Sequence, residues 1–335
     1  MNMYKWVDDV IAMERKTPLP VLSFPSVQKM GITVQELTGS SDLQAEGIKV
    51  IADNFRTAAA VSYMDLSLEA EAFGSQIRYS EGEVPTVVGS IVSEMEEAQA
   101  LKVPEVGDGR TGLNVEAIRK VVPMITDRPV FAGAIGPFSL AGRLLDVSEA
   151  MYYCFDEPEM VHEVLGKVTE FLIKYMNAYK ETGAAGIVMA EPLAGLLSEE
   201  LAEEFSAQYV RKIVEAVQDE NFLIVYHNCG NSALSTIDTI VTNGCRMFHF
   251  GNAVDMEKIM EHMPANCIGM GNVDPARQFR NGTPDTVYAA SKEVMEKCAR
   301  FPNYVPSSGC DIPPLTDWEN IYAFFRAVDD FYEGR

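Results

Sequence analysis

The stretch GIVMAEPLAGLLSEELAEEFSAQYVRKIVEAVQDENFLIVYH, residues 186–227, indicates the fold of this chain. It begins with a short apolar run, GIVMA, and ends with another, FLIVYH. Between them, Ser198 followed by Glu199 and Glu200 is typical of a helix start, and the following residues show the apolar spacing of a helix. A strand, a crossover helix and a second strand in this order predict a parallel βαβ unit.

The same alternation recurs along the chain. A second helical pattern begins at Asp156 and Pro158 and stops at Thr182 and Gly183, just before the GIVMA run. The candidate strands are eight short apolar runs, at residues 21–24, 60–66, 130–135, 186–190, 222–227, 246–250, 267–271 and 304–308. Eight strands alternating with helices predict an α/β fold of the triosephosphate isomerase (TIM) type, a (β/α)8 barrel.

Two segments fall outside this repeating pattern. The residues before the first run predict an N-terminal helical extension. Residues 70–125 mix glycine, proline and charged residues, and they predict an insertion after the second strand that packs over the barrel. Because the chain has no internal repeat and no long linker, we expect residues 1–335 to form a single domain.

Composition excludes several classes of partner. The 335 residues are 47% hydrophobic, and 49 acidic against 27 basic residues give a formal net charge of -22. Such a surface repels nucleic acid and anionic membranes, although a local basic pocket remains compatible with a small anionic ligand. No run approaches the roughly 20 apolar residues of a membrane span. No export signal is visible and the six cysteines have no disulfide-framework spacing, so we expect a cytoplasmic protein.

Candidate metal ligands follow several of the predicted strands. In a barrel, the carboxyl ends of the strands meet at one face, where active sites form. The FLIVYH run ends in His227 and continues to Cys229, the last run is followed by Cys310, and GIVMA is followed by Glu191. Two thiols, an imidazole and a carboxylate form a donor set that suits zinc. Gly230 and Gly309 are expected to let the backbone turn sharply beside the two thiols.

A plain packing role is the competing interpretation, because a lone His-x-Cys is common and buried cysteines usually behave as small hydrophobic residues. We apply that interpretation to the remaining cysteines, which are Cys154, Cys245, Cys267 and Cys298. Among the other histidines, His249 is expected to lie in the core or behind a metal ligand. His162 and His262 are expected on helix surfaces.

With these residues in place, the sequence resembles the methylcobamide:coenzyme M methyltransferases, the corrinoid-linked branch of the uroporphyrinogen decarboxylase superfamily. The segments that carry the resemblance are GAIGPFSLAGRL at 133–144, MAEPLAGLLSEE at 189–200, IVYHNCGN at 224–231, GMGNVDPARQFRNGTPDTV at 269–287 and SSGCDIPPLTDWENI at 307–321. The resemblance implies that His227, Cys229 and Cys310 bind Zn²⁺ and are catalytic. It also implies that Glu191 is a fourth ligand, which a substrate thiol displaces.

The implied reaction moves a methyl group from a methylated corrinoid to a zinc-activated thiol such as coenzyme M. The chain lacks the corrinoid-binding signature Asp-x-His-x-x-Gly, so the resemblance implies that a separate corrinoid protein carries that cofactor. The sequence leaves the oligomeric state open.

Three alternatives remain open at this stage. In one, the enzyme transfers methyl from a methoxylated or methylated donor to the corrinoid protein. A metal-free decarboxylase of the uroporphyrinogen type is disfavoured, because residues 14–40 supply only Arg15, Lys16 and Lys29 to grip many carboxylates. In the third, the barrel is non-catalytic and zinc is purely structural.

Overall fold

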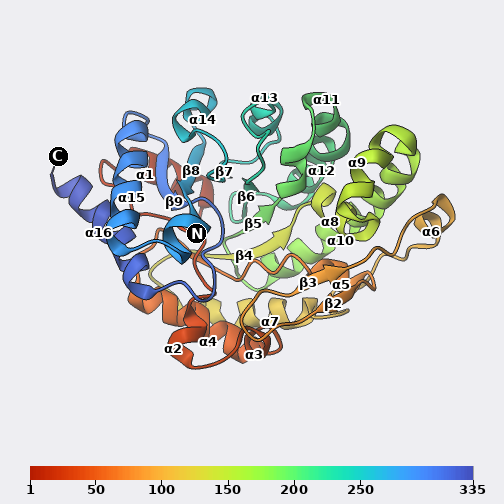
Figure 1. Ribbon diagram of the computed structural model, residues 1–335, viewed down its shortest axis with the longest axis horizontal. Coiled ribbons are helices and arrows are strands. Elements are labelled where there is room, and N and C mark those ends of the chain that lie inside the picture. The colour runs from red at the N-terminus through yellow and green to blue at the C-terminus, as the bar shows by residue number, and fades with distance from the viewer. Residues whose placement is uncertain (335) are drawn as a thin grey trace.

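The computed structural model describes residues 1–334 and has a curled parallel sheet at its centre (Figure 1). The neighbouring strands of this sheet follow the order β1-β4-β5-β6-β7-β8-β9. Their bounds are Ala60–Val61 (β1), Val130–Ile135 (β4), Gly186–Ala190 (β5), Leu223–Asn228 (β6), Met247–Phe250 (β7), Ile268–Val273 (β8) and Tyr304–Ser308 (β9). This architecture confirms the TIM-type barrel.

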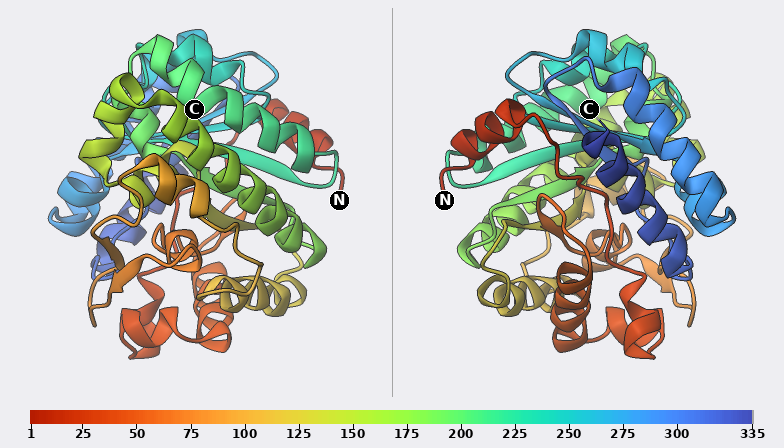
Figure 2. Two further views of the ribbon diagram at one scale, coloured as in Figure 1. Left: turned by 90° about the vertical axis from the view of Figure 1, so that its right-hand side faces the viewer. Right: turned by 90° about the vertical axis from the view of Figure 1, so that its left-hand side faces the viewer.

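Helices surround the sheet (Figures 1 and 2). The α-helices are α1 Met3–Ala12, α2 Ser26–Met30, α3 Val34–Thr38, α4 Ser41–Asn54, α5 Leu68–Ala72, α6 Met95–Ala100, α7 Thr111–Val121, α8 Pro137–Leu145, α9 Val147–Asp156, α10 Pro158–Glu181, α11 Glu199–Ala202, α12 Gln208–Val217, α13 Ile237–Val241, α14 Met256–His262, α15 Pro284–Cys298 and α16 Trp318–Glu333. Short 3₁₀ turns occupy Val122–Met124 and Pro192–Leu196, and π-helical turns occupy Glu203–Ala207 and Pro275–Arg280. Within residues 1–334, no helix combines the length and apolarity that crossing a bilayer requires.

The βαβ unit between β5 and β6 forms as its sequence predicts, with one difference. Ser198 caps the helix by accepting a hydrogen bond from the Leu201 backbone N–H at 3.3 Å. The single long helix that we expected is divided into α11 and α12 by the π-helical turn. Upstream, α10 begins at Pro158 and ends at the predicted place, where Gly183 takes a φ of 88°.

The predicted first strand, residues 21–24, is wrong. Pro18 and Pro20 have no backbone N–H, so this part of the chain cannot form a regular ladder. The segment 18–23 nevertheless lies between β9 and β1 and occupies the place of an eighth strand. On the β9 side, the Leu19 N–H donates to the Pro306 carbonyl at 2.9 Å, and on the β1 side the Ala58 N–H donates to the Pro18 carbonyl at 2.9 Å.

Serine side chains complete this closing seam. The Ser307 hydroxyl donates to the Leu19 carbonyl at 2.7 Å, and the Val21 N–H donates to the Ser308 hydroxyl at 3.1 Å. On the other side, the Ser23 hydroxyl donates to the Val61 carbonyl. Side chains thus supply part of the hydrogen bonding along this seam, where a regular backbone ladder is absent.

The two faces of each strand pack against different partners, because successive side chains of a strand alternate in direction. Val188, Val225 and Met247 lie in register and share one cluster with Met3 and Val7 of α1. The Met3 N–H donates to the carbonyl of Glu220 just before β6, so α1 covers the amino ends of the strands (Figure 2). This cluster therefore fills the barrel interior.

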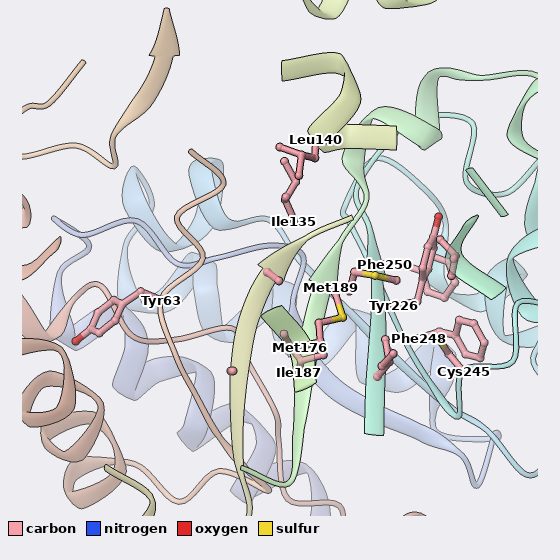
Figure 3. Close-up of a cluster of buried hydrophobic side chains, with 14 of the residues drawn as sticks. Tyr63, Ile135, Leu140, Met176, Ile187, Met189, Tyr226, Cys245, Phe248 and Phe250 are labelled. Atoms are coloured by element: carbon pink, nitrogen blue, oxygen red, sulfur yellow. The ribbon is translucent and has the colours of Figure 1, made fainter. Parts of the chain in front are cut away.

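The alternate side chains point outward and pack beneath the helices. Ile187, Met189, Tyr226, Phe248 and Phe250 belong to this outer cluster, and Figure 3 shows them with their neighbours. A side chain near a strand end therefore points inward if it is an even number of residues from an inward-facing residue of the same strand, and outward otherwise.

The insertion between β1 and β4 also forms as predicted. It contains α5, α6, α7 and the antiparallel hairpin of β2 (Gln76–Arg78) and β3 (Thr86–Val88). The predicted second strand is shorter than expected, because β1 ends at Val61. Beyond it, Asp65 accepts hydrogen bonds from the backbone and hydroxyl of Ser67 and binds Arg110 at 2.5 Å, which holds the chain in a turn.

Candidate metal centre

The structure brings His227, Cys229 and Cys310 together at the carboxyl ends of the strands. Their ligand atoms all lie within 4.8 Å of one another, and Cys310 Sγ lies 3.5 Å from His227 Nε2. His227 belongs to β6, Cys229 follows that strand, and Cys310 follows β9. Among residues 1–334 this is the one such group of histidine, cysteine and acidic side chains.

A hydrogen-bonded chain behind His227 fixes which of its ring nitrogens is free. Since the single proton of the Ser307 hydroxyl goes to Leu19, Ser307 Oγ accepts from His249 Nε2 at 2.9 Å. The other nitrogen of His249, Nδ1, then accepts from His227 Nδ1–H at 2.6 Å. This assignment, made from the network, leaves the lone pair of His227 Nε2 directed toward Cys310.

Burial keeps the relay histidine neutral. Burial and the neighbouring His227 lower the pKa of His249 well below its usual range. A neutral ring can accept one hydrogen bond and donate the other, which the chain from Leu19 to His227 requires. The expectation that His249 lies in the core or behind a candidate ligand is confirmed.

The two thiols share a hydrogen bond. It lowers the pKa of Cys229, and the same hydrogen bond, together with burial, raises the pKa of Cys310 to about 12. Cys310 therefore donates this hydrogen bond and Cys229 accepts it. A cation in the same position would favour deprotonation of both sulfurs.

Gly230 and Gly309 serve a different purpose from the one that we expected. Neither has a positive φ, so neither is needed for a left-handed turn. A Cβ on Gly230 would lie 2.4 Å from the Cα of Gly195, and one on Gly309 would lie 2.8 Å from the backbone nitrogen of Asn252. The glycines allow close approach of neighbouring loops at the candidate metal centre.

Glu191 is not among the three clustered side chains. It has the same parity as Ile187 and Met189, and therefore points outward toward the helices. Its carboxylate accepts from the backbone N–H groups of Phe138 and Ser139, each at 2.8 Å, and from the Ser206 hydroxyl at 2.8 Å. In this arrangement Glu191 caps the N-terminus of α8.

The remaining cysteines and His262 lie where the sequence indicates, and His162 differs in part. The four other cysteines, Cys154, Cys245, Cys267 and Cys298, are buried and free. His262 lies on a helix surface. His162 is only partly exposed, stacks on Phe205 and hydrogen-bonds to the Tyr209 hydroxyl at 2.8 Å.

Sequence reasoning missed two residues at this end of the barrel. Ser307 has the parity of Val305, which faces the interior, so the period of the strand could have identified it. Asp311 follows Cys310 directly, and its Oδ1 is buried with no hydrogen-bond partner among the described residues. Burial, with the charge of Cys310 as a smaller cause, raises the pKa of Asp311 well above its usual range.

A cavity of about 310 Å³ opens beside Asp311. Its polar wall consists of Ser67, Thr86, Arg143 and Asp311, and its remaining lining is apolar. We call it the Arg143 cavity. Because Arg143 lies on the helix after β4 and Asp311 follows β9, the cavity belongs to the same end of the barrel as the clustered thiols.

A barrel with reactive side chains gathered at the carboxyl ends of its strands is the arrangement of a TIM-type enzyme. The model of the uroporphyrinogen decarboxylase (URO-D) family matches residues 21–331, and the chain belongs to this family. The methylcobamide:CoM methyltransferase MtbA of Methanosarcina acetivorans is 32% identical over 274 residues, which cover 80% of this chain and 78% of the relative.

Two further comparisons agree with this assignment. A solved methyltransferase from Methanosarcina mazei superposes with a TM-score of 0.83 at 25% identity, covering 94% of each chain. The uroporphyrinogen decarboxylase of Hydrogenovibrio crunogenus is 23% identical over 319 residues, which cover 92% of this chain and 88% of the relative. Within the family, the chain is an enzyme of the methyltransferase branch.

Proposed function

We propose that this enzyme transfers a methyl group from a methylated corrinoid, carried by a separate protein, to a small thiol. We further propose that His227, Cys229 and Cys310 hold a zinc ion that activates the thiol. The observation that carries the proposal is the convergence of these three donors within 4.8 Å at the carboxyl ends of the strands. The similarity to a methylcobamide:CoM methyltransferase from Methanosarcina acetivorans supports the choice of substrates.

The donor set fits a catalytic zinc. Two thiolates and an imidazole suit this borderline-soft cation, and three protein ligands leave one tetrahedral position for a substrate. When bound, zinc lowers the pKa of a coordinated thiol, so that a thiolate nucleophile is present at neutral pH. We do not assign the open position to Glu191, because both of its oxygens accept hydrogen bonds at α8.

The protein's own groups prepare the site. The relay through His249 leaves His227 Nε2 without a proton, and the hydrogen bond from Cys310 lowers the pKa of Cys229, which favours its thiolate form as a ligand. In the proposed reaction, the substrate sulfur forms a bond to the methyl carbon while the cobalt–carbon bond breaks. The electron pair of that bond stays with the corrinoid, and the thiol proton goes to solvent.

The three cations of residues 14–40, which could hold the carboxylates of a decarboxylase substrate, all have other partners. Arg15 pairs with Asp329 at 2.7 Å on the exterior, and the Lys16 ammonium donates to three carbonyls at the end of α1. Lys29 lies over the ring of Trp318, 4.7 Å from its centroid. This placement favours methyl transfer over decarboxylation of a substrate with many carboxylates.

The test compares metal content and methyl transfer. Wild-type protein is expected to contain about one zinc per chain and to consume methylcobalamin with a thiol. Cys229→Ser and Cys310→Ser should each lose the metal while keeping native circular dichroism, and Cys267→Ser is the matched control outside the site. If wild type reconstituted with zinc binds no metal, the proposal is wrong.

The products separate the two directions of transfer. Formation of a thioether from the thiol supports the proposed direction. A thiol that only inhibits, together with methylation of the reduced corrinoid by a methylated donor, would identify the demethylating reaction instead. Unfolding on zinc removal would favour a structural metal.

A further inference from the structure

Arg143 is an unusual cation in this structure. It is half-buried on α8, and no hydrogen bond or ion pair joins its guanidinium to any group within residues 1–334. The other arginines in that range that have no recorded partner, Arg56, Arg78, Arg277, Arg280 and Arg326, are all exposed to solvent. Burial lowers the pKa of Arg143, yet a guanidinium stays protonated in proteins.

A half-buried charge without a counter-charge is costly, so its retention calls for an explanation. The nearby carboxyl of Asp311 lines the same cavity but forms no ion pair with Arg143. Ser67 is also engaged, because its hydroxyl donates to Asp65 and accepts from Arg110. The cavity wall thus has a cation that the protein itself does not neutralise.

The helix that carries Arg143 is fixed at both ends. Glu191 accepts from two N–H groups of its first turn, and the carbonyl of Leu144 accepts from Ile91 at 2.9 Å and from Val92 at 3.1 Å. The guanidinium is therefore presented to the cavity from a rigid support. Apolar neighbours such as Phe24, Met64 and Ile312 lower the local dielectric and strengthen its attraction for an anion.

We infer that Arg143 binds the anionic group, a sulfonate or a carboxylate, of the small thiol that this enzyme methylates. This inference rests on the proposed function. The planar guanidinium fork matches the paired oxygens of such groups. In a protein with a net charge of -22, a half-buried cation without a counter-charge, in a cavity that is also lined by Asp311 next to Cys310, gives an anionic thiol a favourable place to bind.

The first experiment compares charged and neutral thiols. With methylcobalamin as donor, kcat/KM is measured for 2-mercaptoethanesulfonate, 3-mercaptopropionate and the neutral 2-mercaptoethanol. Wild type should prefer both anionic thiols, and Arg143→Gln should reduce the ratio of anionic to neutral kcat/KM by about 10- to 100-fold. Arg143→Lys should restore part of this ratio, and Arg326→Gln, an exposed control, should leave it unchanged.

The second experiment requires neither metal nor methyl transfer. Binding of ethanesulfonate, which has no thiol, is measured by calorimetry for wild type and Arg143→Gln, and the substitution should weaken it at least about 10-fold. Arg143→Gln should unfold at the wild-type temperature or above it, because it removes an unpaired half-buried charge.

The outcomes separate the two proposals. Ethanesulfonate binding that depends on Arg143, in a protein that methylates no thiol, would refute the proposed function while supporting the anion site. A wild type without preference for anionic thiols, or an unchanged ratio in Arg143→Gln, would overturn the inference even if methyl transfer is found.

Discussion

Replacing His249 by phenylalanine tests whether the hydrogen-bonded chain behind His227 controls metal affinity. The change keeps a ring of similar size in the buried site and removes the nitrogen that accepts from His227 Nδ1–H at 2.6 Å. His227 is then free to adopt the other tautomer, with its proton on the nitrogen that faces Cys310. Loss of such a supporting partner typically lowers metal affinity about 10- to 100-fold.

That range corresponds to about 1.4 to 2.8 kcal/mol of binding free energy. Zinc affinity is measured by competition with a chromophoric chelator at fixed pH, beside circular dichroism to confirm folding. His249→Asn, whose amide oxygen can accept a hydrogen bond, should retain more affinity than His249→Phe. The exposed control His262→Phe should match wild type. A folded His249→Phe protein that binds zinc as tightly as wild type would refute the reasoning.

Three further substitutions test buried polar groups. Glu191→Gln should lower the free energy of unfolding in urea by about 1 to 3 kcal/mol, because the cap of α8 weakens. Its zinc content should equal that of wild type. Loss of zinc from a stably folded variant would instead make Glu191 a ligand. Burial raises the pKa of Glu69 from 4.5 to about 8. Between pH 4.5 and 8 the folded state therefore binds one more proton than the unfolded state. As pH rises through this range, the free energy of unfolding of wild type should fall relative to that of Glu69→Gln by up to about 1.4 kcal/mol per pH unit. Parallel plots of unfolding free energy against pH for the two proteins would contradict this. Arg110→Met leaves buried Asp65 unpaired and should cost about 3 to 5 kcal/mol, and a loss below about 1 kcal/mol would show that solvent replaces the guanidinium.

The sequence was sufficient for the barrel, and it identified the three side chains that the structure brings together. Strand runs and helix starts are local signals, and the shared carboxyl edge of parallel strands explains why His227, Cys229 and Cys310 converge. The predicted first strand was wrong for a local reason as well, because Pro18 and Pro20 remove donors that a ladder needs.

Other features depend on contacts between distant segments. Glu191 follows its strand by one residue, and the period of two places it outside the barrel, under α8. Arg143 lies within a segment that carries the family resemblance, but the sequence does not reveal that its guanidinium has no partner. The relay from Leu19 to His227 joins residues far apart in the chain, so no local sequence pattern predicts it.

The closing seam couples the stability of the Leu19 segment to metal binding at His227. The carbonyl of Leu19 receives the last proton of the relay, while its N–H holds the seam to Pro306. If β9 separates from this segment, the hydrogen bond between Ser307 and Leu19 breaks, and the relay no longer fixes the orientation of the His227 ring. Coupling of this kind is reciprocal, so occupancy of the metal centre should slow hydrogen exchange at Leu19. Hydrogen exchange at the Leu19 amide, which contacts none of the three candidate ligands, would then report whether the metal centre is occupied.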